Sequence, residues 1–469
     1  MCQSRHLIYL TTLKDNEVIC HELLLVKGFV EKICHCNIIT LQDIKKNKIY
    51  QYTLVKNCNN FKFLIQLECG QNQYIINYCS ASQRLNLFFE PSNSIYHIQP
   101  LYIIHQNHDG HFQTEDEKPN SPVEACKIIE LNLKIVQCLF AEKLLESGLT
   151  NNLRKTFSLK SKCLIFHSKQ SVEKALESDE NTLWNDLAFE IINSNLGEDS
   201  KIKFVAFLAC TRYNGKDLSG DTSYENIKKN TRANPALGGG GLALFGSGYF
   251  YSWPTTFEEI IDCFKNYKKI DLSTQLDESN YRRTYGGCFA TTLGAIAHEI
   301  GHCFDLGHTK EGIMGNGFDY VNLAFVNEDF TENLPDRIVQ TESVKDQRLT
   351  KIKKGENKFL ENYHEQKGGG DCTYFSKNCS IILAHHKWFN LQNESDEKSE
   401  ITFMKSIIKS SKFNLVLIEI REKVNGLVIQ FYELLNRKHK EFEVPEHFTK
   451  LERYNIFVIT ENGDLKLFE

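Results

Sequence analysis

The sequence predicts a multidomain α+β protein with an N-terminal β-sandwich, a central mixed, twisted sheet carrying helices, and a small C-terminal β domain. Residues 1–105 hold short segments rich in Ile, Val, Tyr and Phe between polar clusters, which is typical of a sandwich. Beyond residue 122, helical periodicity alternates with strand-like segments, which favours a mixed sheet. Residues 400–469 again hold short strand candidates. The 469 residues give room for about three domains.

Polar stretches set the domain boundaries that we expect, at 1–115, 123–391 and 400–469. The sequence GHFQTEDEKPNSP at 110–122 has the composition of a linker, as does QNESDEKS at 392–399. Between them, Gly368–Gly370 indicates a hinge or turn.

In the N-terminal part, strands are expected at 19–30, 49–55, 61–67, 74–78, 85–89 and 95–104. Cys34-His35-Cys36 has the residue types of a metal site, but such a site needs further ligands at defined spacing. Because none is close in sequence, chance is the favoured interpretation. The same holds for His105, His108 and His111.

In the central part, periodicity predicts a helix over 126–149, strands at 163–167 and 202–211, and a helical segment over 172–194 between them. A further strand is expected at 242–253 and a helix at 254–264. A longer helix is expected from Cys288 to Phe304. Gly294 and Gly301 lie inside it, and each lowers its stability by roughly 1 kcal/mol relative to Ala, so close packing is expected at both.

Residues 284–319 carry the strongest chemical signal in the chain. His298 and His302 are four residues apart, so they lie on one face of a helix, and both rings can reach one metal ion. Glu299 is placed to touch a water at the metal rather than the metal itself. The helix is expected to end around Asp305 to Gly307, and His308 returns as a third ligand. Three protein ligands leave one position open, as in catalytic zinc sites.

HExxH alone is a modest signal, and the competing interpretation is an amphipathic helix with two surface histidines. The third histidine and Gly-Ile-Met-Gly at 312–315 favour the metal site. HEIGHCFDLGH with GIMG resembles the metzincin clan of zinc metallopeptidases. More narrowly, the chain resembles a eukaryotic family of zinc metalloproteinases of fungi and insects, usually described as intracellular. This resemblance covers about residues 125–390, including PALGGGGLALFGSGYFYSWPTTFEEI at 235–260 and DCTYFSKNCSIILAHHKWFN at 371–390.

The resemblance implies a metzincin-like peptidase domain and specific roles. His298, His302 and His308 match the ligands of one Zn²⁺, Glu299 the general base, and Met314 the Met-turn. The clan's sheet has an edge strand beside the cleft that pairs with substrate. By chain order 242–253 is the best candidate for that strand, and an interior position is the alternative.

The chain departs from the clan's pattern in two places. The clan's glycine after the second histidine is Asp305 here, and Asp tolerates left-handed geometry better than most residues. The position of a clan tyrosine is Asn316, and Tyr320 is a possible substitute.

The function that we expect is a zinc-dependent metalloendopeptidase acting on peptide or protein, with Glu299 as general base toward a zinc-activated water. The alternatives are a catalytically silent zinc-containing peptide- or protein-binding protein, and a hydrolase of a non-peptide amide. A net charge of −5 gives no reason to expect nucleic-acid binding. No membrane segment or signal peptide is recognisable, and 16 scattered cysteines suit a reducing compartment. We therefore expect a cytoplasmic or nuclear protein that is not secreted, of unknown oligomeric state.

Overall fold

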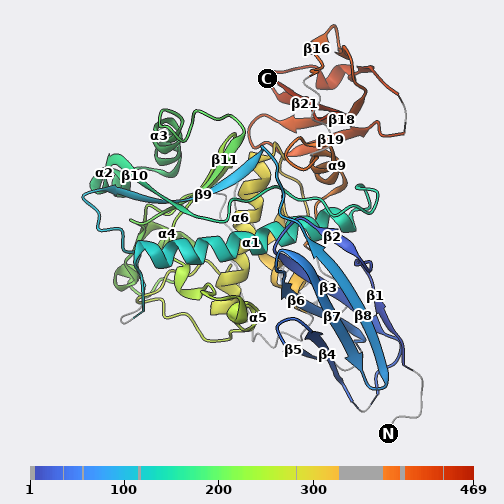
Figure 1. Ribbon diagram of the computed structural model, residues 1–469. Coiled ribbons are helices and arrows are strands. Elements are labelled where there is room, and N and C mark those ends of the chain that lie inside the picture. Colours follow the sequence, from blue (N-terminus) through green and yellow to red (C-terminus); the bar gives the residue numbers. More distant parts are fainter. Residues whose placement is uncertain are drawn as a thin grey trace.

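A computed structural model describes residues 6–34, 36–54, 58–114, 118–280, 282–326, 373–390, 397–436 and 438–469. It is a mixed α and β protein of several sheets. The N-terminal strands and the C-terminal strands flank a central part that carries the long helices (Figure 1). The expected turn at Gly368–Gly370 and most of the expected linker at 392–399 lie outside the described residues.

The N-terminal strands form two sheets around one apolar core. The first sheet has the order β1 (Ile8–Leu10), β3 (Leu23–Val30), β6 (Asn60–Gln66). The second has the order β2 (Glu17–Ile19), β8 (Ala81–Phe89), β7 (Gly70–Tyr78), β4 (Ile38–Asp43), β5 (Lys48–Thr53). Side chains from both sheets meet in a shared core, which is the arrangement of a sandwich.

Strand β3 connects this sandwich to the rest of the molecule. Successive residues of a strand point to opposite faces. Leu24 and Val26 therefore enter the sandwich core, whereas Leu23 and Leu25 enter the large central core. Helix α1 (Pro122–Glu146) packs on that second face of β3 and also contacts β9 (His97–Gln106). This two-sided burial explains the nearly continuous apolar run of β3.

The central sheet has the order β10 (Leu164–Ser171), β9, β11 (Ile202–Leu208), β15 (Leu242–Phe245), β14 (Ala236–Gly239). The first four strands are parallel and β14 is antiparallel, so the sheet is mixed as predicted. Helices α2 (Val172–Glu177) and α3 (Glu180–Ile192) cover one face. On the other face lie α1 and α6 (Tyr285–Cys303), which cross each other in Figure 1.

Strand β9 corrects one sequence expectation. The strand predicted at 95–104 forms, but it is a central strand of this parallel sheet and not part of the N-terminal sandwich. Its side chains are apolar on both faces because helices cover both, and Tyr102 and Ile103 lie in different cores. Because β9 directly follows the sandwich strands in sequence, it was wrongly expected to pair with them.

The identity of the edge strand is the second point at which the structure differs from the sequence expectation. The stretch 242–253 was expected as one strand at the sheet's edge, but only β15 forms, and it lies between β11 and β14. The edge strand is β14. The chain reverses at Gly240, whose φ is +53°, so the glycine run makes a tight hairpin that adds one more strand outside β15.

The C-terminal strands form two further sheets around a small core of their own. One has the order β16 (Ile401–Met404), β17 (Ile407–Ser410), β20 (Glu441–Glu443), and the other β19 (Val428–Glu433), β18 (Leu415–Glu422), β21 (Tyr454–Thr460), β22 (Leu465–Phe468). Helix α9 (Lys377–His385) packs on β18 and β21 and joins them to the central core.

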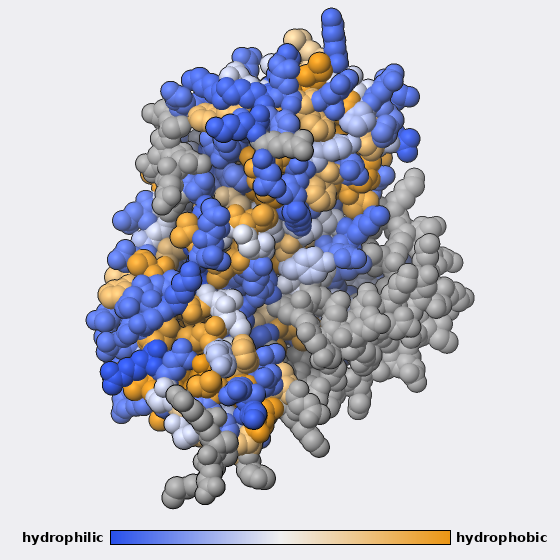
Figure 2. Space-filling view, turned by 90° about the vertical axis from the view of Figure 1, so that its right-hand side faces the viewer, coloured by the Kyte–Doolittle hydropathy of each residue, from blue (hydrophilic) through white to orange (hydrophobic). Residues whose placement is uncertain are grey.

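Shorter elements complete the described chain: β12 (Arg212–Tyr213), η1 (Gly215–Leu218), α4 (Tyr224–Lys229), β13 (Thr231–Arg232), η2 (Phe250–Ser252), η3 (Phe257–Glu259), α5 (Ile260–Phe264), η4 (Asn316–Tyr320), α7 (Asn322–Phe325) and η5 (Glu446–Phe448). Within the described ranges, no helix is both long enough and apolar enough to cross a membrane. Figure 2 shows hydrophilic and hydrophobic residues intermixed on the face it presents.

Candidate metal centre

Helix α6 carries the first two predicted ligands. It begins three residues earlier than expected, where the Thr284 hydroxyl caps it by accepting a hydrogen bond from the Gly287 N–H. One helical turn apart near its C-terminal end, His298 and His302 present their rings on the same side, with 3.1 Å between the two Nε2 atoms. The spacing of four residues therefore places both rings on one face of the helix, as the sequence predicted.

The helix ends in a left-handed turn at Asp305. Its φ is +63°, so Asp305 takes a left-handed conformation that glycine adopts most readily. The Leu306 N–H bonds the Gly301 carbonyl at 3.1 Å and the Asp305 N–H bonds the His302 carbonyl at 3.0 Å. These two bonds form a Schellman motif. The predicted turn is confirmed, and it redirects the chain toward His308.

His308 completes the cluster from outside the helix. Its Nε2 lies 3.0 Å from the Nε2 of His302. The three rings are one of two groups of possible metal-ligating side chains among the described residues. The structure thus brings together the three histidines that the sequence singled out.

A backbone carbonyl fixes the tautomer of each ring. The Nδ1 of His298 is 2.8 Å from the Ile313 oxygen, that of His302 is 2.8 Å from the Leu306 oxygen, and that of His308 is 2.6 Å from the Asn425 oxygen. A carbonyl only accepts, so each Nδ1 carries the proton and donates it. Each Nε2 is then an unprotonated lone-pair donor when the ring is neutral.

Burial keeps these rings neutral. It lowers the pKa of His298 to about 4 and lowers the pKa values of His302 and His308 as well. The Nε2 lone pair of His302 lies about 3 Å from each of the other two, and such lone pairs repel one another unless a cation lies between them. Tetrahedral ligands at about 2.0–2.1 Å from zinc are about 3.3–3.4 Å apart, close to the observed spacing. The donor set therefore fits a zinc ion.

Glu299 lies beside this cluster on α6. The residue is buried, with 7% of its surface exposed, and burial raises the pKa of its carboxyl to about 8. A hydrogen bond from the Gly238 backbone N–H acts in the opposite direction. Strand β14 and α6 approach so closely that a Cβ at Gly238 would lie 2.0 Å from the Glu299 carbonyl oxygen. Glycine at 238 is what allows the edge strand to lie against the helix.

Met314 lies against the helix below the histidines. It is buried, and a Cβ added to Gly301 would meet its Sδ at 2.5 Å. A Cβ at Gly294 would lie 1.8 Å from the Phe318 carbonyl oxygen. The close packing predicted at both glycines is confirmed. The Met-turn role of Met314 stays a prediction. Tyr320 is buried in η4 and is not among the residues lining the cavity described below.

The C-terminal domain contributes contacts that the sequence did not reveal. The His308 N–H donates to the Gly426 carbonyl at 3.1 Å, and the Val428 N–H donates to the His308 carbonyl at 2.9 Å. The Arg421 guanidinium donates to the Asp305 carbonyl at 2.7 Å. Neither Arg421 nor Asn425 belongs to a recognisable motif, and no sequence signal could have placed them here.

A cavity of about 360 Å³ opens at this centre. Its walls come from β14, from the end of α6 and the turn after it, and from the C-terminal domain: Leu237, Gly238, Gly239, Glu299, His302, Asp305, Leu306, Gly307, His308, Arg421, Asn425 and Gly426. The edge strand thus borders the same cavity as two histidines and Glu299.

Four other histidines have partners elsewhere. His105 Nδ1 lies 3.4 Å from the Cys210 sulfur, and His108 Nε2 accepts from Arg212 at 3.0 Å. His111 lies near Asp109. His386 faces Asp305 at 3.4 Å. Among the described residues, none of the four belongs to a converging ligand set.

Comparison with known proteins places the chain in a family. Residues 7–362 match the model of a family described as "Putative peptidase family". The chain belongs to this family. The matched range includes His298, Glu299, His302 and His308, and it ends before the C-terminal β domain.

Two curated relatives carry the description putative zinc metalloproteinase. The chain is 36% identical to the one from Saccharomyces cerevisiae over 113 residues, which is 23% of this chain and 16% of that protein. It is 31% identical to the one from Schizosaccharomyces pombe over 114 residues, which is 24% of this chain and 18% of that protein. The matched stretches thus span less than a fifth of either relative.

Proposed function

We propose that the chain is a zinc-dependent metalloendopeptidase with a metzincin-like centre, in which His298, His302 and His308 hold one Zn²⁺. The observation that carries the proposal is the convergence of three Nε2 lone pairs whose Nδ1 protons are all donated to backbone carbonyls. Family membership and the names of the two relatives point to the same chemistry.

A zinc ion held there supplies a Lewis acid that polarises a carbonyl and makes water more acidic. Glu299 takes the proton of the attacking water on its carboxylate and delivers it to the leaving nitrogen. Burial raises the pKa of the Glu299 carboxyl, but a nearby positive charge favours the ionised carboxylate that this role requires.

Strand β14 supplies the argument for a peptide substrate. It is the edge of the central sheet and borders the cavity. An edge strand offers unpaired N–H and C=O groups to an extended chain. A peptide lying along β14 would bring its backbone next to Glu299, and this distinguishes an endopeptidase from a hydrolase of isolated amides.

The decisive experiment compares the wild-type chain with Glu299→Gln for zinc content and for cleavage of an unfolded protein such as reduced casein. We expect equal zinc in both, and a loss of cleavage of at least about 100-fold in the variant, because general-base catalysis contributes about 10²–10⁴. Glu173→Gln, which removes an exposed carboxylate on α2, is the matched control. Equal cleavage by wild type and Glu299→Gln would remove Glu299 from the mechanism. Zinc binding without cleavage by the wild type would favour a silent binding protein.

A further inference from the structure

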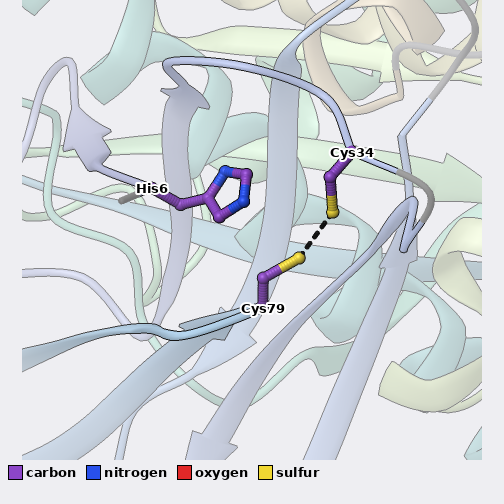
Figure 3. A group of neighbouring side chains, drawn as sticks. All are labelled: His6, Cys34 and Cys79. Atoms are coloured by element: carbon purple, nitrogen blue, oxygen red, sulfur yellow. Dashed lines mark hydrogen bonds between the residues drawn. The ribbon is translucent and has the colours of Figure 1, made fainter. Parts of the chain in front are cut away.

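The second group of possible metal ligands among the described residues lies in the N-terminal sandwich. His6, Cys34 and Cys79 each offer one ligand atom, and these atoms all lie within 4.8 Å of one another. Figure 3 shows the imidazole and the two thiols directed toward a common space. The sequence analysis favoured chance for Cys34-His35-Cys36 because no partner was near in sequence. The fold supplies two partners from distant segments.

Each ligand comes from a different connection of the sandwich. His6 precedes β1, Cys34 lies between β3 and β4, and Cys79 lies in the turn between β7 and β8. The group therefore links both sheets at one end. The Cys34 N–H donates to the Tyr78 hydroxyl at 2.9 Å, and the buried His6 ring packs edge-on against Tyr78 at 5.4 Å. These contacts hold the three segments together around the ligand atoms.

A third thiol lies beside the group. Cys36 follows Cys34 by two residues, and its thiol interacts with that of Cys79. The Cys34 thiol in turn donates to the Cys36 carbonyl at 3.3 Å. The thiols of Cys34, Cys36 and Cys79 are therefore crowded together at one end of the sandwich.

The position of Cys79 adds an independent observation. Cys79 has φ +50° in the two-residue turn that joins β7 to β8. Such hairpin turns prefer Asn or Gly, because left-handed geometry is unfavourable for other residues. A cysteine held there directs its thiol to the cluster at a conformational cost that a purely structural turn does not need.

We propose that His6, Cys34, Cys36 and Cys79 bind a structural zinc ion, separate from the histidine centre of α6. Three thiolates and one imidazole form a closed tetrahedral set typical of structural zinc. Binding would release the three thiol protons to solvent, with the His6 ring as the fourth ligand. The ion would fasten the start of the chain to both sheets, and its loss would loosen that end of the sandwich.

The competing outcome is a disulfide between Cys34 and Cys79, whose sulfurs are 2.6 Å apart. A disulfide needs about 2.05 Å, and two thiolates on one zinc are about 3.7 Å apart given Zn–S near 2.3 Å. The observed sulfur–sulfur distance lies between these two values, so it does not distinguish a disulfide from a zinc site. The set of available ligands does. A disulfide would use two sulfurs and give no role to His6 or Cys36, whereas zinc uses all four.

Cobalt substitution of the reduced full-length chain tests the proposal separately from the peptidase centre. Thiolate-bound Co²⁺ gives a near-ultraviolet charge-transfer band that an all-histidine site lacks. We expect this band in the wild type and in His302→Ala, and its loss in the double variant Cys34→Ser, Cys79→Ser. Cys69→Ser, which removes an exposed thiol of the same domain, should keep the band. Zinc content should fall by one per chain in the double variant relative to Cys69→Ser, which keeps both sites.

The single variant Cys36→Ser covers the case in which the double variant fails to fold. It should fold and bind cobalt with a weaker band, because one of three thiolates is lost. A wild-type protein without the band, or a band that persists in the double variant, overturns the proposal. A Cys34–Cys79 disulfide found by peptide mass mapping, together with no band after reduction, would identify a redox pair instead.

Discussion

The Nδ1 of His308 lies 2.6 Å from the carbonyl oxygen of Asn425, which is 117 residues further along the chain. This hydrogen bond fixes the tautomer of the third candidate ligand, and it comes from the C-terminal β domain. Two more backbone bonds join His308 to Gly426 and Val428. The C-terminal domain is therefore part of the candidate metal centre, although the family match ends at residue 362.

The first prediction tests this contribution. Gly426 has φ +67°, and a Cβ there would lie 3.8 Å from His308 Nδ1. Gly426→Ala strains the backbone that holds His308, by roughly 1–2 kcal/mol, and we expect zinc affinity at the histidine site to fall about tenfold, within the range seen when outer-shell partners are lost. Competition with a fluorescent chelator measures the affinity.

Gly70→Ala is the matched control for this prediction. Gly70 also has a positive φ of +87°, but it lies in the N-terminal sandwich with open space around its Cβ position. It should lower stability by a similar amount and leave zinc affinity unchanged. An equal loss of zinc affinity in both variants would argue against a positioning role for the 425–428 segment.

The second prediction concerns the ligands themselves. His302 lies between the other two rings, with its Nε2 3.1 Å from that of His298 and 3.0 Å from that of His308. His302→Ala should lower the zinc content by one ion per chain and abolish cleavage. The control is His111→Ala, which removes an exposed ring. Mass-spectrometric metal analysis after gel filtration gives the readout, and unchanged zinc in His302→Ala would refute the site.

The third prediction concerns packing behind the metal centre. Gly294→Ala should stabilise an isolated helix by about 1 kcal/mol. Here the new Cβ would lie 1.8 Å from the Phe318 carbonyl oxygen, and backbone atoms cannot move aside cheaply. Overpacking costs about 1–3 kcal/mol, so we expect a net loss of stability in urea unfolding. Gly241→Ala, where nothing lies within 4 Å of the added Cβ, should change stability little. A stabilised Gly294→Ala protein would mean that η4 does not press on α6.

The fourth prediction is a pH dependence outside the metal centre. Burial, with a smaller contribution from Asp277, raises the pKa of Glu278 from 4.5 to about 7. A carboxyl whose pKa is higher in the folded state stabilises the fold below its unfolded pKa, and this contribution is lost as the pH rises through the folded pKa. The wild type should therefore lose stability between about pH 4.5 and 7 relative to Glu278→Gln, which stays neutral.

The measurement for Glu278 is the difference in unfolding free energy between the two proteins at pH 5 and pH 8. One pKa unit corresponds to about 1.4 kcal/mol, so we expect the difference to change by a few kcal/mol at most. The Gln side chain can still accept the hydrogen bond that the Asn234 amide donates to Glu278. A difference that does not vary with pH would show that Glu278 titrates normally.

Local patterns predicted much of the centre. The spacing of His298 and His302, the breaker after the helix and the left-handed tolerance of Asp305 all depend on residues within one or two helical turns, and the structure reproduces each. The close contacts at Gly294 and Gly301 were also foreseeable, because a glycine inside a helix lowers its stability unless packing requires it.

Partner choice across the chain was not predictable. Strand β9 was assigned to the sandwich because neighbours in sequence were taken as neighbours in space, and β15 was assigned to the sheet edge by its order along the chain. Cys34 gained His6 and Cys79 as neighbours through folds of the chain that no short-range pattern encodes.

The sequence alone determined the chemistry available: three imidazoles, one adjacent carboxylate, and the helix and turn that order them, since these depend on local backbone preferences. Only the tertiary structure decided which strand borders the cavity, and which distant carbonyl holds His308. Those contacts join segments far apart in the chain, 117 residues in the case of His308 and Asn425, and they arise from burying shared apolar surface rather than from any periodicity that can be recognised along the chain.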